Sequence, residues 1–408
     1  MTAPELPDDL FGLHAPLDFR REFGRIVSIL ARRFGFHRLE LCEDAAQTAM
    51  LHAVQAWARQ MPDDPGAWLY RVAHNHVLDE LRRDKRDERY LAEPQLTHSL
   101  QEAEDDVLRL LFVCADPAIP PEAQLVLALK TLCGFSTDEI ALRLFQSADA
   151  VHKKLQRARA RLRDHAEVES LEPDRVASVL LMLYLLFNEG YSSSQPDHLI
   201  RRELCDEALR LALMLSAHPE GALPETDALI ALMCFHGARF DARIDGAGGL
   251  LLLEEQDRSR WDVALIQRGV EHLARSARGS SLTRYHVEAG IAAEYCSASS
   301  YADTDWSEIV RLYEALDRIA PSPLNLMNRA IAIAEWQGAD KGLAALSTLE
   351  VPSWLRDYYL WDATLGELHR RCGDRANALA HTKRALGAAP TNPERALLAR
   401  RLQQINEG

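Results

Sequence analysis

The stretch LCEDAAQTAMLHAVQAWARQMPDDPGAWLYRVAHNHVLDELRR, residues 41–83, decides the fold of the first part of this chain. Apolar residues recur at intervals of three and four on both sides of the turn-rich loop MPDDPG at 61–66, and this period is typical of helices. The stretch therefore predicts two helices joined by a short loop. The polar and aromatic residues that mark the two helices are Asp44, Gln47, Trp57, Trp68 and Arg83.

Length and composition indicate a globular protein of several domains. The 408 residues are 47% hydrophobic and 26% charged, and a single core rarely exceeds roughly 250–300 residues. We therefore expect two or three domains. No run of eighteen apolar residues is present, and the acidic N-terminus lacks the basic and apolar regions of a signal peptide. The sequence predicts a cytoplasmic protein without membrane contact.

Neither the cysteines nor the known catalytic motifs indicate an enzyme. The seven cysteines form no CxxC pair, so we expect most of them to be buried apolar residues. His74 and His76 have no third partner that would complete a metal site. The motifs GxxxxGK[ST], HExxH, GxSxG and GxGxxG are absent from the sequence. We predict no catalytic residue, no metal and no cofactor.

A basic segment at 151–163, VHKKLQRARARLR, contrasts with the formal net charge of −14. It holds six Lys and Arg residues and no acidic one. Such a run lacks i,i+4 ion-pair support, which favours a phosphate partner over a plain solvated helix. Distant acidic charges are screened within about 10 Å, so they do not prevent local phosphate binding.

The residues around this segment predict a helix-turn-helix. Gly134 fits a helix C-cap, Ser136 and Glu139 form a capping box, and Ser147 fits the N-cap of the basic helix. Two short helices, a tight turn and a basic second helix define the motif. One apolar face is predicted for the basic helix, at Val151, Leu155, Ala158 and Leu162.

The chain after this motif reads as a large helical extension. In 361–393, small residues and a proline fit the 34-residue tetratricopeptide repeat (TPR). These residues are Leu365, Gly366, Ala378, Ala385 and Pro390. His369 and Thr382 stand where an aromatic residue is commoner. Segments 305–321 and 324–350 look like weaker units, and stacked units of this kind form solenoids with a binding surface.

Residues 41–86 resemble region 2 of bacterial extracytoplasmic-function (ECF) RNA polymerase sigma factors. The helix-turn-helix resembles region 4 of the same proteins. LYLLFNEGYSSS (183–194) and GLLLLEEQDRSRWD (249–262) resemble the extension of the subgroup that ends in a TPR-like domain. The resemblance implies an all-α protein. Its expected parts are region 2 at 15–90, an acidic linker at 91–107, region 4 at 108–166 and a regulatory extension at 170–408.

The resemblance also implies partners and site residues. Region 2 would bind the β′ clamp helices of core RNA polymerase, and region 4 would bind the β flap and the minus-thirty-five promoter element. The loop at 61–66 would capture a flipped base, so that promoter melting needs no ATP. The expected polymerase-binding residues are Asp44, Gln47, Thr48 and Trp57. Those for the minus-ten element are Pro65, Trp68, Arg71, Asn75, Arg82 and Arg83. Those for the minus-thirty-five element are Asp149, His152, Lys153, Lys154, Gln156, Arg157 and Arg159.

One departure limits what the resemblance transfers. The run Ala150-Val151-His152-Lys153-Lys154 stands where the family usually has Thr-Val-Lys-Ser-Arg. The helix-turn-helix prediction survives this change, but base preferences do not carry over.

Several alternatives stay open on sequence alone. Trp57 and Trp68 fit a bundle core as well as a promoter surface, and the second helix fits a solvated face. The acidic linker could imitate phosphates in a polymerase channel or act as a tether. The charged cluster at 254–262 fits an internal or interdomain salt-bridge network better than acid–base chemistry. The alternative function is a helix-turn-helix activator with a TPR-like sensor domain. The extension would have a protein or small-molecule partner in either case.

Overall fold

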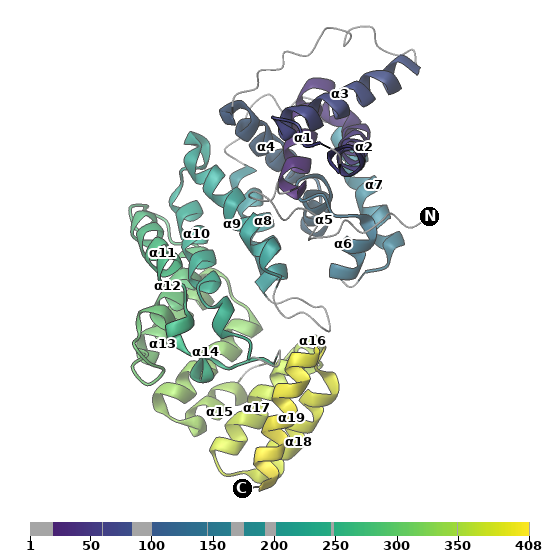
Figure 1. Cartoon of the computed structure of the whole chain (residues 1–408). Helices are drawn as coiled ribbons and strands as arrows, with labels where there is room; N and C mark the ends of the chain where they lie inside the picture. The colour runs from purple at the N-terminus through teal and green to yellow at the C-terminus, as the bar shows by residue number, and fades with distance from the viewer. Residues whose placement is uncertain are drawn as a thin grey trace. The chain divides into compact units, whose positions relative to one another are not determined.

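The computed structural model describes residues 19–58, 60–83, 100–144, 146–164, 175–191, 201–245, 249–348 and 350–407. These residues are helical almost throughout (Figure 1). They contain no strand, and their one β-bridge joins Ile244 to Leu250. The predicted all-α fold class is therefore confirmed. The chain forms two compact units that divide at Val179.

The first unit begins with the predicted helix–loop–helix and ends with the predicted helix-turn-helix. Its first elements are α1 (Phe19–Phe34), η1 (Phe36–Arg38), α2 (Leu39–Trp57) and α3 (Pro65–Arg83). They are followed by α4 (Leu100–Cys114), α5 (Pro121–Thr131), α6 (Thr137–Arg143) and α7 (Ala148–Asp164).

Small side chains on α2 let three helices pack closely. Ala45, Ala46, Ala49 and Ala53 are fully buried, and α2 packs against both α1 and α3. Large apolar side chains of the neighbouring helices fill the space around these alanines. They include Ile26, Leu30 and Phe34 of α1 and Leu69 and Val77 of α3. Interiors of this density leave no room for larger residues on α2.

Local capping fixes the helix-turn-helix as predicted. Gly134 has φ +67°, and glycine adopts this left-handed backbone conformation at little cost in free energy. Gly134 ends the turn that follows α5. Ser136 N–H donates to Glu139 at 2.7 Å and Glu139 N–H donates to Ser136 at 3.1 Å, which completes the capping box. Ala150 N–H donates to Ser147 at 3.2 Å at the start of α7.

The structure differs from the predicted linker at 91–107. Residues 91–99 lie outside the described part of the chain, whereas residues 100–107 form the first half of α4. Asp106 from the acidic cluster is buried, and it accepts a hydrogen bond from Arg32 of α1 at 2.7 Å. Local composition cannot predict an ion pair between two residues that are 74 positions apart in the sequence.

The second unit places consecutive helices side by side. It holds α8 (Val176–Tyr191, which the unit boundary crosses), α9 (Arg202–Ala217), η4 (Pro219–Gly221), α10 (Pro224–Gly237), η5 (Phe240–Ala242), η6 (Leu253–Glu255), η7 (Arg258–Arg260), α11 (Val263–Ser276) and α12 (Arg284–Ser297). It continues with α13 (Trp306–Ile319), α14 (Pro323–Gln337), α15 (Ala339–Ser347), α16 (Ser353–Arg356), α17 (Tyr359–Arg371), α18 (Arg375–Ala388) and α19 (Asn392–Glu407). From α10 onwards most helices pack against the next one in sequence (Figure 1), which is the contact pattern of a helical solenoid.

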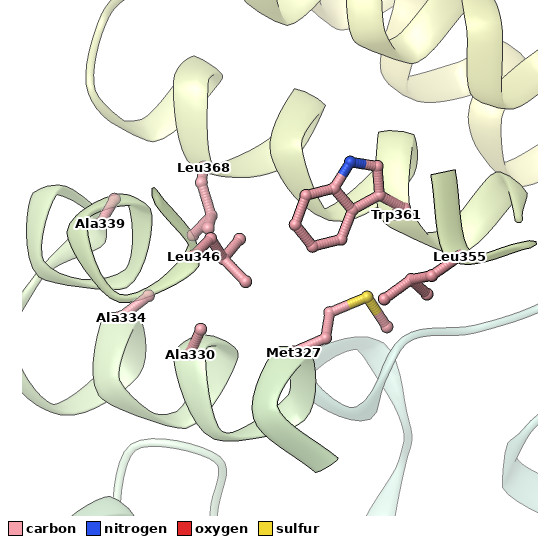
Figure 2. Close-up of a cluster of buried hydrophobic side chains, with 8 residues drawn as sticks. All are labelled: Met327, Ala330, Ala334, Ala339, Leu346, Leu355, Trp361 and Leu368. Carbon is pink, nitrogen blue, oxygen red and sulfur yellow. The ribbon is translucent and has the colours of Figure 1, made fainter. Parts of the chain in front are cut away.

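A hydrophobic cluster joins α14 to α17 in this unit. Figure 2 shows Trp361 of α17 beside Met327 of α14 and Leu355 of α16. Ala330, Ala334, Ala339, Leu346 and Leu368 complete the cluster. Gly342 of α15 lies so close to α14 that an added Cβ would stand 2.6 Å from the Ala334 Cβ and 2.9 Å from the Ala330 carbonyl oxygen.

We predict that Gly342→Ala destabilises the protein by about 1–3 kcal/mol, because the new methyl group overpacks the contact between α14 and α15. Urea titrations followed by circular dichroism measure the effect. Gly387→Ala is the matched control, since a Cβ at this helical position meets nothing within 4 Å. It should stabilise the protein by about 0.4–1 kcal/mol. Equal effects of the two changes would contradict the proposed close approach.

Candidate polymerase and promoter surfaces

The outer face of α2 carries the residues predicted to bind a protein partner. Asp44 and Gln47 are exposed one turn apart, and Thr48 beside them is half-buried. Leu51, one turn after Gln47, is 46% exposed although it is a large apolar residue. Sequence analysis did not single out Leu51. Together Asp44, Gln47 and Leu51 form a mixed polar and apolar patch of the kind that protein interfaces use.

Trp57, which was also predicted to bind the partner, lies in the core of the bundle. Only 7% of it is exposed, and its ring packs edge-on against Trp68 with centroids 5.6 Å apart. The centre of the Phe19 ring lies 5.9 Å from that of the Trp57 ring. Trp57 therefore anchors α1, α2 and α3 to one another. Trp68 is half-buried.

The loop before α3 and the exposed side of α3 hold the predicted minus-ten residues. Asp64 accepts a hydrogen bond from Ala67 N–H at 2.9 Å and caps α3, while Pro65 is the first helical residue and is half-buried. Arg71 and Asn75 are both exposed, and their spacing of four places them on one face. Both side chains carry donors of the kind that bind phosphates and base edges.

The end of α3 carries two further arginines. Arg82 pairs with Asp79 at 3.1 Å, and Arg83 pairs with Glu80. All four residues lie at the surface, where such i,i+3 pairs contribute little and exchange easily. A phosphate could therefore replace either carboxylate as the partner of its arginine.

Most of the predicted promoter-reading residues of α7 form one open face. Val151, Leu155, Ala158 and Leu162 are buried, as the spacing predicts. The exposed residues are Asp149, His152, Lys153, Gln156 and Arg157. Lys154 is instead half-buried and binds Glu122 of α5 at 2.7 Å. This hydrogen bond lowers the pKa of Glu122.

Arg159 lies apart from this open face. Its side chain is 11% exposed and binds two carboxylates of α2, those of Glu43 and Glu40. Glu43 is only 1% exposed. Burial raises the pKa of Glu43 to about 7, and the guanidinium of Arg159 opposes that rise. Arg159 was predicted to contact DNA, but in this arrangement it joins α7 to α2.

The two sequence stretches that marked the extension come together around the end of α10. Arg243 donates to the Tyr191 carbonyl oxygen at 2.7 Å, and its guanidinium lies 3.9 Å from the centre of the Tyr191 ring. Arg239 donates to Gln256 at 3.2 Å and lies over the Trp261 ring. Two arginines after α10 thus connect residues 183–194 to residues 249–262.

The charged cluster at 254–262 differs from the predicted salt-bridge network. Its described contacts are caps and backbone anchors. Glu255 accepts from Leu252 N–H at 2.7 Å, Asp257 from Ser259 N–H at 2.9 Å, and Asp262 from Leu265 N–H at 3.0 Å. Arg258 donates to the carbonyl oxygens of Tyr295 and Ala298, both at 2.7 Å. The cluster holds a loop in place.

Other predicted features have simple structural roles. His74 is fully buried beside the rings of Phe34 and Tyr70, and burial lowers its pKa. Among the described residues, no three His, Cys, Asp or Glu side chains lie together as metal ligands do. None of the described helices combines the length and the apolar character needed to cross a bilayer.

Comparison with known protein families finds a match for each end of the first unit. Residues 19–87 match the family model for Sigma-70 region 2, and residues 117–162 match that for Sigma-70, region 4. Together the two matches indicate a sigma factor of the ECF type. Its extension begins with a segment, residues 175–277, that matches a family of unknown function, DUF6596.

A relative matches over nearly the whole chain. An uncharacterized protein of Rhizobium meliloti (strain 1021) is 35% identical over 391 residues, which cover 91% of each chain. The extension is therefore shared with that protein together with the two sigma regions. No solved structure matches this chain.

The buried imidazole of His236 predicts a pH-dependent stability. Its ring lies tilted against that of Tyr191 with centroids 4.5 Å apart, and its Nδ1 is buried without a partner among the described residues. Burial, aided by Arg239 and Arg243, lowers its pKa to about 3. The unfolded chain binds a proton below about pH 6.5 that the folded chain cannot bind, so stability falls as the pH falls.

We expect the free energy of unfolding to decrease by about 2 kcal/mol between pH 7.5 and pH 5 through this group. His236→Phe keeps an aromatic ring beside Tyr191 but cannot titrate, so the stability of this variant should depend less on pH over the same range. Urea titrations at the two pH values measure the difference. Parallel losses in the two proteins would rule out His236 as the source.

Proposed function

We propose that this protein binds core RNA polymerase through α2 and directs it to promoters that α3 and α7 recognise. The observation that carries the proposal is the exposed patch of Asp44, Gln47 and Leu51 on a helix that matches Sigma-70 region 2. Exposed large apolar residues beside polar ones mark protein contacts. The expected partner is the pair of clamp helices of the β′ subunit.

The exposed side of α3 supports a role in promoter melting. Arg71 and Asn75 offer donors to one strand, and the half-buried Trp68 offers a ring face for stacking. Stacking on an aromatic side chain contributes about 1–3 kcal/mol per base, which offsets the few kcal/mol of unstacking. Selective binding of the opened strand therefore replaces ATP as the source of free energy for melting.

The open face of α7 supports recognition of the upstream promoter element. Lys153 and Arg157 are exposed at a spacing of four, so both can reach one phosphate backbone while His152 and Gln156 face the groove. Asp149 lies in the first turn of α7, where its carboxylate suits the helix dipole.

The first test concerns polymerase binding. We predict that Asp44→Arg combined with Gln47→Arg abolishes co-purification with core polymerase, because two cations replace the polar patch. Circular dichroism should remain unchanged, since both side chains are exposed. The matched control is Asp340→Arg with Gln337→Arg, which makes the same exchange at exposed positions of the second unit. Co-purification equal to that of the control would remove α2 as the polymerase contact.

The second test concerns the basic face. Lys153→Ala or Arg157→Ala should weaken binding of the holoenzyme to promoter DNA, and each should reduce the slope of log affinity against log salt by about one. Filter binding at several salt concentrations gives the slope. Lys383→Ala, an exposed lysine of the second unit, is the control. Slopes unchanged in both variants would mean that α7 does not present this face to DNA.

We further propose that the extension, a TPR-like helical repeat domain, regulates the sigma regions and stabilises the holoenzyme. Its helices pack in sequence order, and small residues stand at the close contact of α17 with α18, as in TPR units. A protein or small molecule would bind such a solenoid through its concave surface.

Removal of the extension tests that role. We expect the 1–168 fragment to be less active than the full chain in run-off transcription with core polymerase, because holoenzyme contacts are lost. Binding of the fragment to polymerase, measured beside transcription, separates weakened assembly from misfolding. Activity equal to the full chain would refute a regulatory role, and higher activity would identify the extension as an inhibitor.

A further inference from the structure

An irregular segment of the extension reaches from α10 to α19. Residues 249–257, GLLLLEEQD, hold only one short helical turn, η6, and are called the strap below. Arg400 of α19 donates to the Leu250 carbonyl oxygen at 3.0 Å and pairs with Asp245, shortly before the strap, at 3.4 Å. The strap therefore contacts a helix whose arginine lies 150 residues later in the sequence.

The far end of the strap is fixed near the ends of α10 and α12. Gln256 is buried and accepts a hydrogen bond at 3.2 Å from Arg239, two residues after α10. Arg258, directly after the strap, donates to the carbonyl oxygens of Tyr295 and Ala298, both at 2.7 Å. These carbonyls stand at the end of α12, where a helix leaves its last acceptors unpaired.

The middle of the strap interacts with two further parts of the extension. Burial, followed by the carboxylates of Glu335 and Glu254, raises the pKa of Tyr301 well above its usual range. A hydrogen bond to Glu367 and the charge of Glu254 raise the pKa of Arg370. The Glu254 carboxylate therefore lies within electrostatic range of the loop after α12 and of the end of α17.

These contacts place the strap on the hollow side of the solenoid. The helices pack as pairs, α10 with α11, α12 with α13, α14 with α15 and α17 with α18, and α19 follows at the far end. Figure 1 shows this series from teal through green to yellow. Stacked helix pairs curve into an arc with a concave surface. A segment that joins α10 to α19 is a chord of that arc, and a chord lies inside its arc.

We propose that the strap is an internal pseudo-ligand, which occupies a peptide-binding groove on the concave side of the extension. The groove would take an extended segment of a partner protein that has large aliphatic residues followed by carboxylates, as the strap has. This inference rests on the proposed role of the extension in binding a partner. Arg239 and Arg400 supply donors, and an irregular chain offers carbonyl and carboxylate oxygens that accept from them.

The contacts that hold the strap can exchange with a partner. The side chains of Arg400 and Asp245 are 43% and 28% exposed, and partly exposed pairs contribute only about 0–1 kcal/mol. The four consecutive leucines, Leu250 to Leu253, are all half-buried. A partner segment that offers aliphatic and acidic residues in the same order therefore replaces the strap without loss of a buried core.

A fluorescent peptide with the sequence of the strap, GLLLLEEQD, tests the groove in the full chain. Replacing the four leucines by serine weakens the internal occupant and leaves Arg239 and Arg400 in place. A groove that is closed about 90% of the time binds about tenfold more weakly than an open one. We therefore expect the serine variant to bind the peptide about tenfold more tightly than the unmodified chain, as measured by anisotropy. The control peptide GLLLLKKQK should bind to neither protein.

Arg400→Ala provides a second variant, which keeps the sequence of the strap. It removes the contact with α19, so a glutamate-specific protease should cleave after Glu254 or Glu255 about fivefold faster. Mass spectrometry identifies the cleavage sites. Arg384→Ala is the matched control, because Arg384 is also an exposed arginine in an ion pair, with Asp362 at 3.0 Å, on helices α18 and α17.

The outcomes separate the groove from the sigma function. A serine variant that is folded by circular dichroism and binds the peptide no more tightly than the unmodified chain would overturn the groove. If that variant does not fold, equal cleavage rates of Arg400→Ala and Arg384→Ala would overturn it instead. Co-purification of the unmodified chain with core polymerase is measured in parallel. Its failure would overturn the proposed sigma function and leave the peptide result unaffected.

Discussion

Close approach between helix backbones is the constraint on which both units depend. The described residues form no sheet, so every apolar helix face must be covered by another helix. Alanines on α2 and glycines at positions 24 and 342 make this possible, because an added Cβ at either glycine would collide with a neighbouring backbone or side chain. The surfaces that serve function are those that this packing leaves uncovered.

The helix α2 shows how packing and function share one element. Its small residues face the core, Glu40 and Glu43 meet Arg159, and Asp44, Gln47 and Leu51 face outward. A period of 3.6 residues distributes these roles around one cylinder. A change in the core contact therefore shifts the partner surface.

In the extension, three guanidinium groups around the end of α10 hold the core through carbonyl oxygens, an amide and aromatic rings, and no ion pair with a carboxylate is among their described contacts. Arg243 and Arg258 donate to carbonyl oxygens, and Arg239, Arg243 and Arg258 each lie over an aromatic ring. Hydrogen bonds to carbonyls satisfy a buried guanidinium at a lower desolvation cost than a second buried charge would add. This cluster gives the segment of unknown function a physical role, which is to hold distant loops against α10.

Local sequence determined the helices, the caps of the helix-turn-helix and the apolar face of α7, because these depend on side chains three or four residues apart. It also identified the exposed residues Asp44, Gln47, Lys153 and Arg157 through the resemblance. Only tertiary structure decided that Trp57 is a core anchor, that α4 extends into the predicted linker, and that Arg159 binds Glu43, 116 residues away. Which partner neutralises a charged side chain depends on long-range packing, and no local pattern records that choice.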